Sequence, residues 1–141
     1  MSADERVLDV VRGWVDKAEN DLANASLVLR SGRNGPMDTV AFHAQQCAEK
    51  YLKALLSFRG IDFPKIHDVE LLLVLAEMTD EAVLSVDEQR LLTAYATVTR
   101  CPGDYEPVTV TEARRAVTLA RRVRASVRRE LPGAVVRKPR E

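Results

Sequence analysis

The chain has 141 residues, of which 46% are hydrophobic, and this length predicts one domain that can bury a core without disulfides or a structural metal. Acidic and basic residues are equal in number, so the net charge of zero excludes binding of nucleic acid or membrane through overall charge alone. The longest apolar run, residues 71–76, is too short to span a bilayer, and Cys47 and Cys101 match no zinc spacing, which together predict a cytoplasmic protein with reduced thiols.

The first predicted helix covers residues 5–31. Its apolar side chains recur at alternating intervals of three and four, which is the heptad pattern of a helix packed along a neighbour at a shallow angle: Leu8, Val11, Val15, Ala18, Leu22, Ala25 and Leu29. This heptad carries more apolar face than one neighbouring helix needs. It therefore predicts a homodimer.

The second predicted helix begins near Pro36, which suits a first helical turn, and ends at about Phe58, before Gly60. A polar row lies beside its apolar row and contains His43, Gln46, Glu49, Lys50 and Lys53. Residues 43, 46 and 50 share one helical face. We expect Lys50 to hold a phosphate there and Gln46 a base edge or ribose. In the alternative interpretation, His43 only bonds an acidic residue or a buried carbonyl group between helices.

Three further helices follow. Asp68 is a suitable N-cap for a helix over residues 69–78, and Ser85 with Glu88 forms a capping box for the next one. Thr109 or Thr111 begins the last helix, which ends at Pro132–Gly133. The sequence thus predicts an all-α, antiparallel up-and-down bundle of about five helices, three long and two short, in one domain over residues 1–131. Residues 132–141 are predicted to be a disordered basic tail.

Charge is distributed unevenly along the chain. Acidic residues predominate between positions 62 and 112, and basic residues predominate after them. Arginine pairs recur every seven residues at 114–115, 121–122 and 128–129, so they form a ridge on the last helix. This ridge either pairs with the acidic third and fourth helices, or meets a nucleic-acid backbone or an acidic partner.

Residues 42–56 resemble the F-H-A-Q-Q-A-A-E-K-x-L-K-A-L signature of HEPN domains (higher eukaryotes and prokaryotes nucleotide-binding). His67-Asp68 resembles the start of the third helix in that family, and the segment 99–102 followed by Tyr105 resembles its R-Y-P-D-x-Y loop. The resemblance implies a helical bundle, a homodimer and a partner nucleotidyltransferase, in some cases as a toxin–antitoxin pair. It also directs attention to Arg100, on a loop mounted on a rigid scaffold.

The resemblance also implies a candidate activity, because many HEPN proteins are metal-independent ribonucleases that share an R-x4-6-H motif. In this sequence no histidine follows Arg100 at that spacing, and Tyr105 stands there instead. The sequence therefore favours a non-enzymatic module that binds nucleotide or RNA through His43, Gln46, Lys50 and Arg100. Two alternatives stay open: a ribonuclease toxin that uses Arg100, Tyr105 or His43, and a purely structural dimeric bundle. No metal-ligand pattern or glycine-rich phosphate loop occurs, so no metal and no cofactor are expected.

Overall fold

The computed structural model describes residues 1–96 and 107–137. These residues form α1 (Ala3–Leu29), η1 (Gly32–Asn34), α2 (Met37–Arg59), α3 (Val69–Leu75), α4 (Val86–Ala94), α5 (Val110–Glu130) and α6 (Gly133–Val136), and they contain no strand. The predicted all-helical bundle is confirmed. No helix within the two described ranges is both long enough and apolar enough to cross a membrane.

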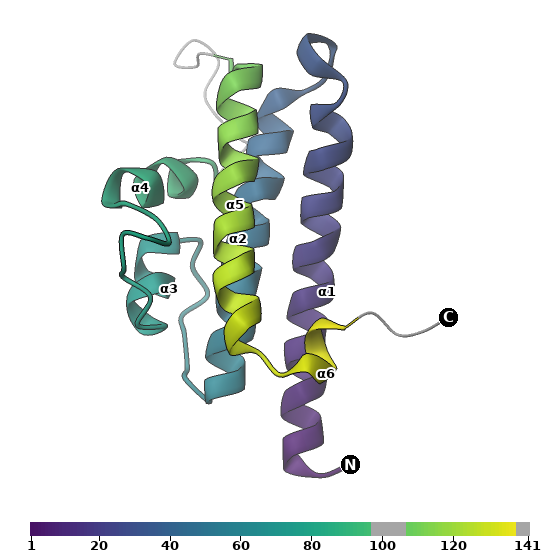
Figure 1. Ribbon diagram of the computed structural model, residues 1–141, viewed down its shortest axis with the longest axis vertical. Coiled ribbons are helices and arrows are strands. Elements are labelled where there is room, and N and C mark those ends of the chain that lie inside the picture. The colour runs from purple at the N-terminus through teal and green to yellow at the C-terminus, as the bar shows by residue number, and fades with distance from the viewer. Residues whose placement is uncertain (97–106, 138–141) are drawn as a thin grey trace.

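The three long helices lie side by side, and Figure 1 shows their directions. The start of α1 lies beside the end of α2, since Val7 and Ser57 line the same hollow, so these two helices are antiparallel. The starts of α2 and α5 also share a hollow, and at their ends Arg59 lies 3.7 Å from Glu130. The antiparallel prediction thus applies to α1 against its neighbours, whereas α2 and α5 run in the same direction.

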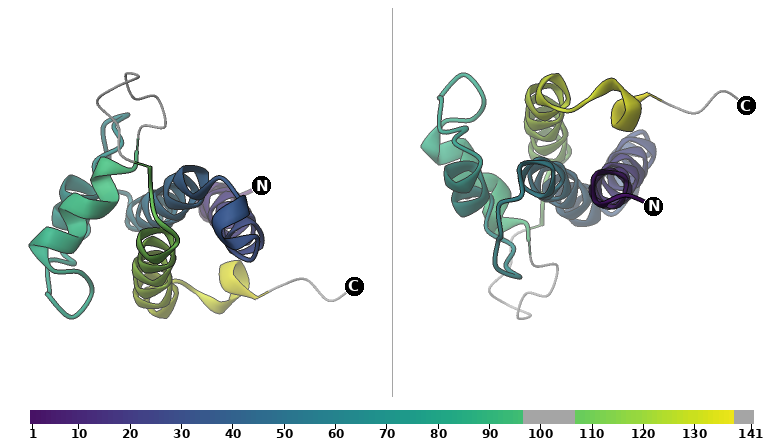
Figure 2. Two further views of the ribbon diagram at one scale, coloured as in Figure 1. Left: turned by 90° about the horizontal axis from the view of Figure 1, so that it is seen from above. Right: turned by 90° about the horizontal axis from the view of Figure 1, so that it is seen from below.

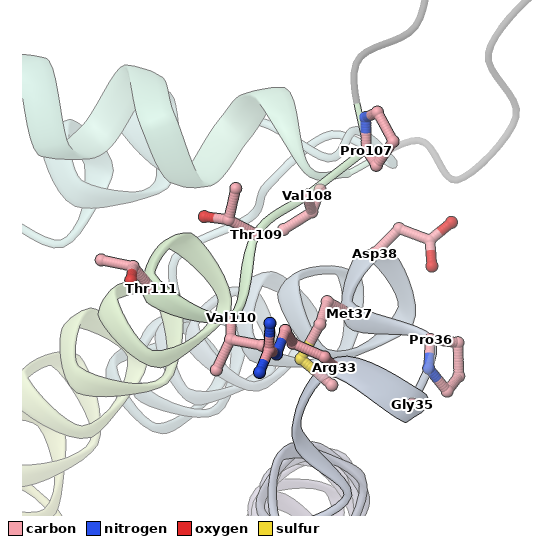
Figure 3. A pocket seen from close by; sticks show the side chains of 10 residues that line it. All are labelled: Arg33, Gly35, Pro36, Met37, Asp38, Pro107, Val108, Thr109, Val110 and Thr111. Carbon is pink, nitrogen blue, oxygen red and sulfur yellow. The ribbon is translucent and has the colours of Figure 1, made fainter.

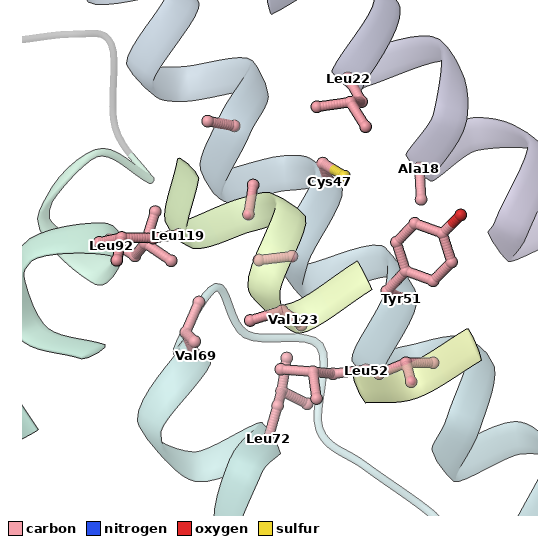
Figure 4. Packing of buried hydrophobic residues seen from close by; sticks show 14 of the residues in the cluster. Ala18, Leu22, Cys47, Tyr51, Leu52, Val69, Leu72, Leu92, Leu119 and Val123 are labelled. Carbon is pink, nitrogen blue, oxygen red and sulfur yellow. The ribbon is translucent and has the colours of Figure 1, made fainter. Parts of the chain in front are cut away.

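Helix α2 is at the centre of the molecule. The end-on views of Figure 2 place it between α1, α5 and the α3–α4 pair. Fully buried side chains from these helices meet around it, as Figure 4 shows for Tyr51, Leu52, Leu72, Leu119 and Val123. Burying one such leucine contributes about 1.5–3 kcal/mol. The polar row of α2 lies against α1 and the loop that follows α2, since His43 bonds Asp21 of α1 and Glu49 bonds His67.

The predicted helix starts are confirmed by their hydrogen bonds. The Asp68 side chain accepts from the backbone N–H of Leu71 at 3.2 Å, and Ser85 and Glu88 form the predicted capping box. The Thr109 hydroxyl accepts from the N–H of Glu112 at 3.1 Å, which identifies Thr109 rather than Thr111 as the N-cap of α5.

The basic tail predicted from residue 132 is different in the structure. Residues 133–136 form the short helix α6, Val135 is buried, and Arg128 donates to the backbone oxygen of Val136 at 2.8 Å. Burial of an apolar residue and a hydrogen bond from a charged donor order this turn, although four residues are too few to show helical periodicity. Residues 138–141 lie outside the described part of the chain.

The arginine ridge divides over two sides of α5. Arg122 lies 3.0 Å from Glu88 of α4 and Arg115 lies 3.9 Å from it, which matches the predicted pairing with the acidic helices. Arg121 instead donates to the hydroxyl of Ser26 on α1, at 3.1 Å. The arginines of α5 therefore pair with neighbouring helices on both sides.

Candidate functional site

The polar face of α2 consists of His43, Gln46, Glu49, Lys50 and Lys53. Because an α-helix turns by about 100° per residue, these five positions form one continuous arc. Two carboxylates divide the arc into two clusters, one around Asp21 of α1 and the other around Glu49 of α2 itself.

In the first cluster, His43 and Lys50 meet on one carboxylate. His43 Nδ1 lies 2.7 Å from Asp21 Oδ1, and Lys50 Nζ lies 2.5 Å from Asp21 Oδ2. The His43 side chain is 31% exposed and that of Lys50 is 22% exposed. An ionised carboxylate only accepts hydrogen bonds, so Nδ1 is the donor and Nε2 of His43 is left for another partner. The cluster therefore presents an oriented imidazole and an ammonium group to solvent.

Asp21 is the residue that sequence reasoning missed. The alternative interpretation of His43 predicted that an acidic residue bonds it between helices, but it did not identify which one. The position of Asp21 offers a weak signal, because the apolar stripe of α1 passes through Ala18, Leu22 and Ala25, and residue 21 lies at the edge of that stripe. Residue 21 becomes part of the site because α2 packs against α1 and brings His43 and Lys50 to the Asp21 carboxylate.

The second cluster surrounds the carboxylate of Glu49, whose side chain is only 2% exposed. It accepts hydrogen bonds from Lys53 Nζ at 2.6 Å, Gln45 Nε2 at 2.9 Å and His67 Nδ1 at 2.9 Å. Gln46 is also buried, and its amide donates to Gln45 Oε1 at 2.6 Å. The structure thus brings His43 and Lys50 together but directs Gln46 towards the Glu49 cluster.

Glu49 is a buried anion with enough donors to stay ionised. Burial raises the pKa of Glu49, but hydrogen bonds from Lys53, His67 and Gln45 lower it by more, so that it ends below its usual range. The Lys53 ammonium also lies 5.5 Å from the ring centre of Trp14 and 5.8 Å from that of Phe63. This cluster fastens the loop after α2 to α1 and α2.

Two of the predicted site residues, Arg100 and Tyr105, lie outside the described part of the chain, as does Cys101. Their positions relative to His43 and Lys50 remain predictions based on the sequence motif.

A separate pocket of about 640 Å³ lies where α2 and α5 begin. Figure 3 shows Arg33, Met37 and Asp38 on one side of it and Thr109 and Val110 on the other. The ligand-binding residues predicted on α2, positions 43, 46 and 50, do not line it. Within the described residues, no group of three His, Cys, Asp or Glu side chains is arranged to hold a metal ion.

Comparison with known proteins places this geometry in a family. The family model for the HEPN domain matches residues 11–130. The structure of TT1696 from Thermus thermophilus is similar, with 29% sequence identity and a TM-score of 0.68 over 86% of this chain and 98% of that chain. So is that of ST0689, an archaeal HEPN homologue, with 26% identity and a TM-score of 0.64 over 85% and 96%. No curated protein matches the sequence. The match over most of the chain, together with the bundle and the signature on α2, shows that the chain belongs to the HEPN domain family.

Proposed function

We propose that this HEPN domain is a non-enzymatic module that binds nucleotide or RNA phosphate groups on the polar face of α2. In this proposal it acts in the cytoplasm as a homodimer, together with a separate nucleotidyltransferase. The observation that carries the binding proposal is the pairing of His43 and Lys50, both partly exposed, on the single carboxylate of Asp21.

Asp21 leaves hydrogen-bonding capacity on both side chains. An ammonium group has three N–H donors, of which the carboxylate takes one from Lys50, and the imidazole keeps Nε2. Charge-assisted hydrogen bonds to phosphate oxygens are among the stronger polar contacts that proteins make. On the sequence motif, Arg100 is the further contact in this proposal, while Gln46 supports the face from inside the Glu49 cluster.

The binding test uses calorimetry and thermal unfolding with ATP and a short single-stranded RNA as probes. The wild type should gain about 2.7 kcal/mol of stability at a hundred times Kd. His43→Ala and Lys50→Ala should each weaken binding about tenfold, since each removes one hydrogen-bonding contact to the ligand. The matched control is Arg129→Ala, which removes an exposed cation on α5 and should bind like the wild type. Absence of any binding to the wild type would reject the proposal and leave a structural role.

A ribonuclease toxin is the second candidate, because the pairing of Asp21 with His43 orients an imidazole that can move a proton. This candidate predicts RNA cleavage in the presence of EDTA and growth arrest on expression. Both should disappear in Arg100→Ala or His43→Ala, and Tyr105→Phe tests the remaining candidate. RNA binding without cleavage would instead favour the non-enzymatic module.

The proposed dimer is supported by the apolar surface at the start of α1. Val10 is 53% exposed there, and together with Val7 it borders a hollow of about 410 Å³ that Ile61 and Phe63 also line. The resemblance to HEPN domains also implies a homodimer, and we propose that a second copy of the chain covers this hollow. Sedimentation should show a dimer for the wild type and a monomer for Val10→Glu. The control Val74→Glu, at a valine that is 57% exposed on α3, should remain dimeric. A wild-type monomer at micromolar concentration would contradict the dimer.

The partner enzyme is tested by co-expression with the product of a neighbouring nucleotidyltransferase gene. Co-purification of the two chains would support the proposal, and relief of toxicity by the partner would identify a toxin–antitoxin pair. Separate elution of two folded proteins would count against the partnership.

A further inference from the structure

A second polar hollow, the arginine pocket, lies between α1, α5 and α6. Its volume is about 560 Å³, and its walls include Arg124, Arg128 and Arg137 together with Glu19, Val135 and Val136. Pockets that hold small ligands are commonly about 300–1,000 Å³ in volume. The family match ends at residue 130, so α6 and Arg137, which line one side of this pocket, lie beyond the matched segment.

Two of the three arginines are held in place by neighbouring groups. Arg124 donates through Nε to Glu19 at 2.6 Å, while Arg128 donates to the Tyr51 hydroxyl at 3.2 Å and to the backbone oxygen of Val136 at 2.8 Å. A guanidinium group carries five N–H donors, so these bonds do not use the full capacity of either side chain. The pocket therefore has a pre-positioned cationic wall.

Arg137 differs from the other two arginines. It is exposed, and its guanidinium makes no hydrogen bond or ion pair with any residue in the described part of the chain. It lies close over the start of α6, because a Cβ atom built on Gly133 would be 3.4 Å from Arg137 Nε. The Arg137 side chain thus folds back over the start of α6, beside the pocket, and its guanidinium donors have no partner within the described chain.

The charge balance of the pocket favours an anion. Burial raises the pKa of Glu19, but hydrogen bonds from Arg124 and Tyr51 lower it by more, so this carboxylate stays ionised. It forms ion pairs with Arg124 at 2.6 Å and with Arg128 at 3.6 Å. Asp16 also lines the pocket, so three cations face two carboxylates. Arginine forks match the geometry of phosphate oxygens, and the two valines of α6 offer an apolar surface to the rest of a ligand.

We infer that the arginine pocket binds the phosphate group of a small phosphorylated molecule, at a site separate from the polar face of α2. This inference does not depend on the proposed function, since none of His43, Gln46 or Lys50 lines the pocket. The shared chemistry is a phosphate group, which either free phosphate or a nucleoside monophosphate supplies.

The test titrates the full chain with inorganic phosphate and, separately, with AMP, and follows backbone amide signals by NMR. Saturable shifts should appear at the amides of Val135, Val136 and Arg137. Arg137→Gln should weaken binding of the tighter probe about tenfold, because it removes one charged contact without disturbing a bond within the described chain. The matched control, Arg129→Gln, should leave affinity unchanged.

The two probes identify the source of the phosphate. Much tighter binding of AMP indicates a nucleotide-like ligand that also contacts the valines, and equal affinities indicate the free anion. Unchanged affinity in Arg137→Gln, or no saturable shift at α6 with either probe, would overturn the inference. So would loss of these shifts in His43→Ala, which would assign the phosphate to the polar face of α2 instead.

Discussion

At the scale of single residues, the backbone of Glu77 is unusual. Its φ is 54°, and it is the one non-glycine residue with positive φ in the described part of the chain. The N–H of Met78 bonds the Leu73 carbonyl at 2.9 Å across it, which closes the C-terminus of α3. Glycine usually occupies such a position, because a side chain there costs about 1 kcal/mol or more.

Glu77→Gly should therefore stabilise the protein. The left-handed conformation becomes less costly, and the added freedom of the unfolded chain offsets part of this gain, so we expect about 0.5 kcal/mol in urea unfolding. The control Glu81→Gly removes a nearby carboxylate at a position without positive φ and should lower stability. If Glu77→Gly lowers it equally, the conformational argument fails.

Cys47 should be chemically inert in the folded protein. Burial raises the pKa of the Cys47 thiol to about 12, and the negative charges of Glu19 and Asp21 contribute to this rise. Because the thiolate is the reactive form, a thiol reagent at pH 8 should label Cys47 slowly when the protein is folded and rapidly in urea. The measurement requires a Cys101→Ser background, so that only one thiol is counted. Rapid labelling without denaturant would contradict the prediction.

The sequence predicted part of the site at this scale. Helical spacing alone places His43 and Lys50 on one face, because it depends only on the geometry of one helix. The identity of Asp21 depends on how α1 lies against α2, and the direction of Gln46 depends on a side-chain rotamer and on the buried Glu49. Neither can be obtained from the spacing along a single helix.

At the scale of helices, the capping box of α4 holds together a helix of nine residues. Ser85→Ala removes the acceptor for the backbone N–H of Glu88 and should cost about 1 kcal/mol of stability in urea unfolding. Ser126→Ala on α5 is the control, because alanine suits a helix interior and the change there should be neutral or slightly stabilising. Equal losses in both variants would exclude a role specific to the cap.

Caps and long heptads were predicted correctly because their signals are local in the sequence. Asp68, Ser85 and Thr109 bond N–H groups three residues away, so neighbouring residues alone determine them. The relative direction of α2 and α5 and the docking of α6 depend on contacts between distant segments. These features were therefore missed from the sequence.

At the scale of the whole molecule, three carboxylates link stability to pH. Glu19 and Glu49 have lowered pKa values despite burial, because cationic and other donors surround them. The pKa of Glu88 is lowered chiefly by a hydrogen bond from the backbone of Ser85. A carboxylate with a lower pKa in the folded state stabilises the fold above its unfolded pKa, and this contribution is lost on acidification.

Unfolding free energy should therefore be nearly constant around neutral pH and fall as the pH drops below about 4.5, the unperturbed value for these groups. Urea unfolding between about pH 7 and pH 3 measures this dependence. Glu49→Gln should be less stable at neutral pH and should show a shallower acid slope, since one titrating group is gone. An unchanged slope in this variant would show that Glu49 does not contribute.

Trp14 gives the molecule a built-in spectroscopic probe. It is the single tryptophan, its ring meets that of Phe63 edge-on at 6.2 Å, and the Lys53 ammonium lies near its face. Indole emission is sensitive to neighbouring charge, so its wavelength reports on the junction where α1, α2 and the following loop meet. A ligand that draws Lys53 away from Glu49 would shift the emission wavelength of Trp14 without any added label. A ligand confined to the arginine pocket would leave that wavelength unaltered.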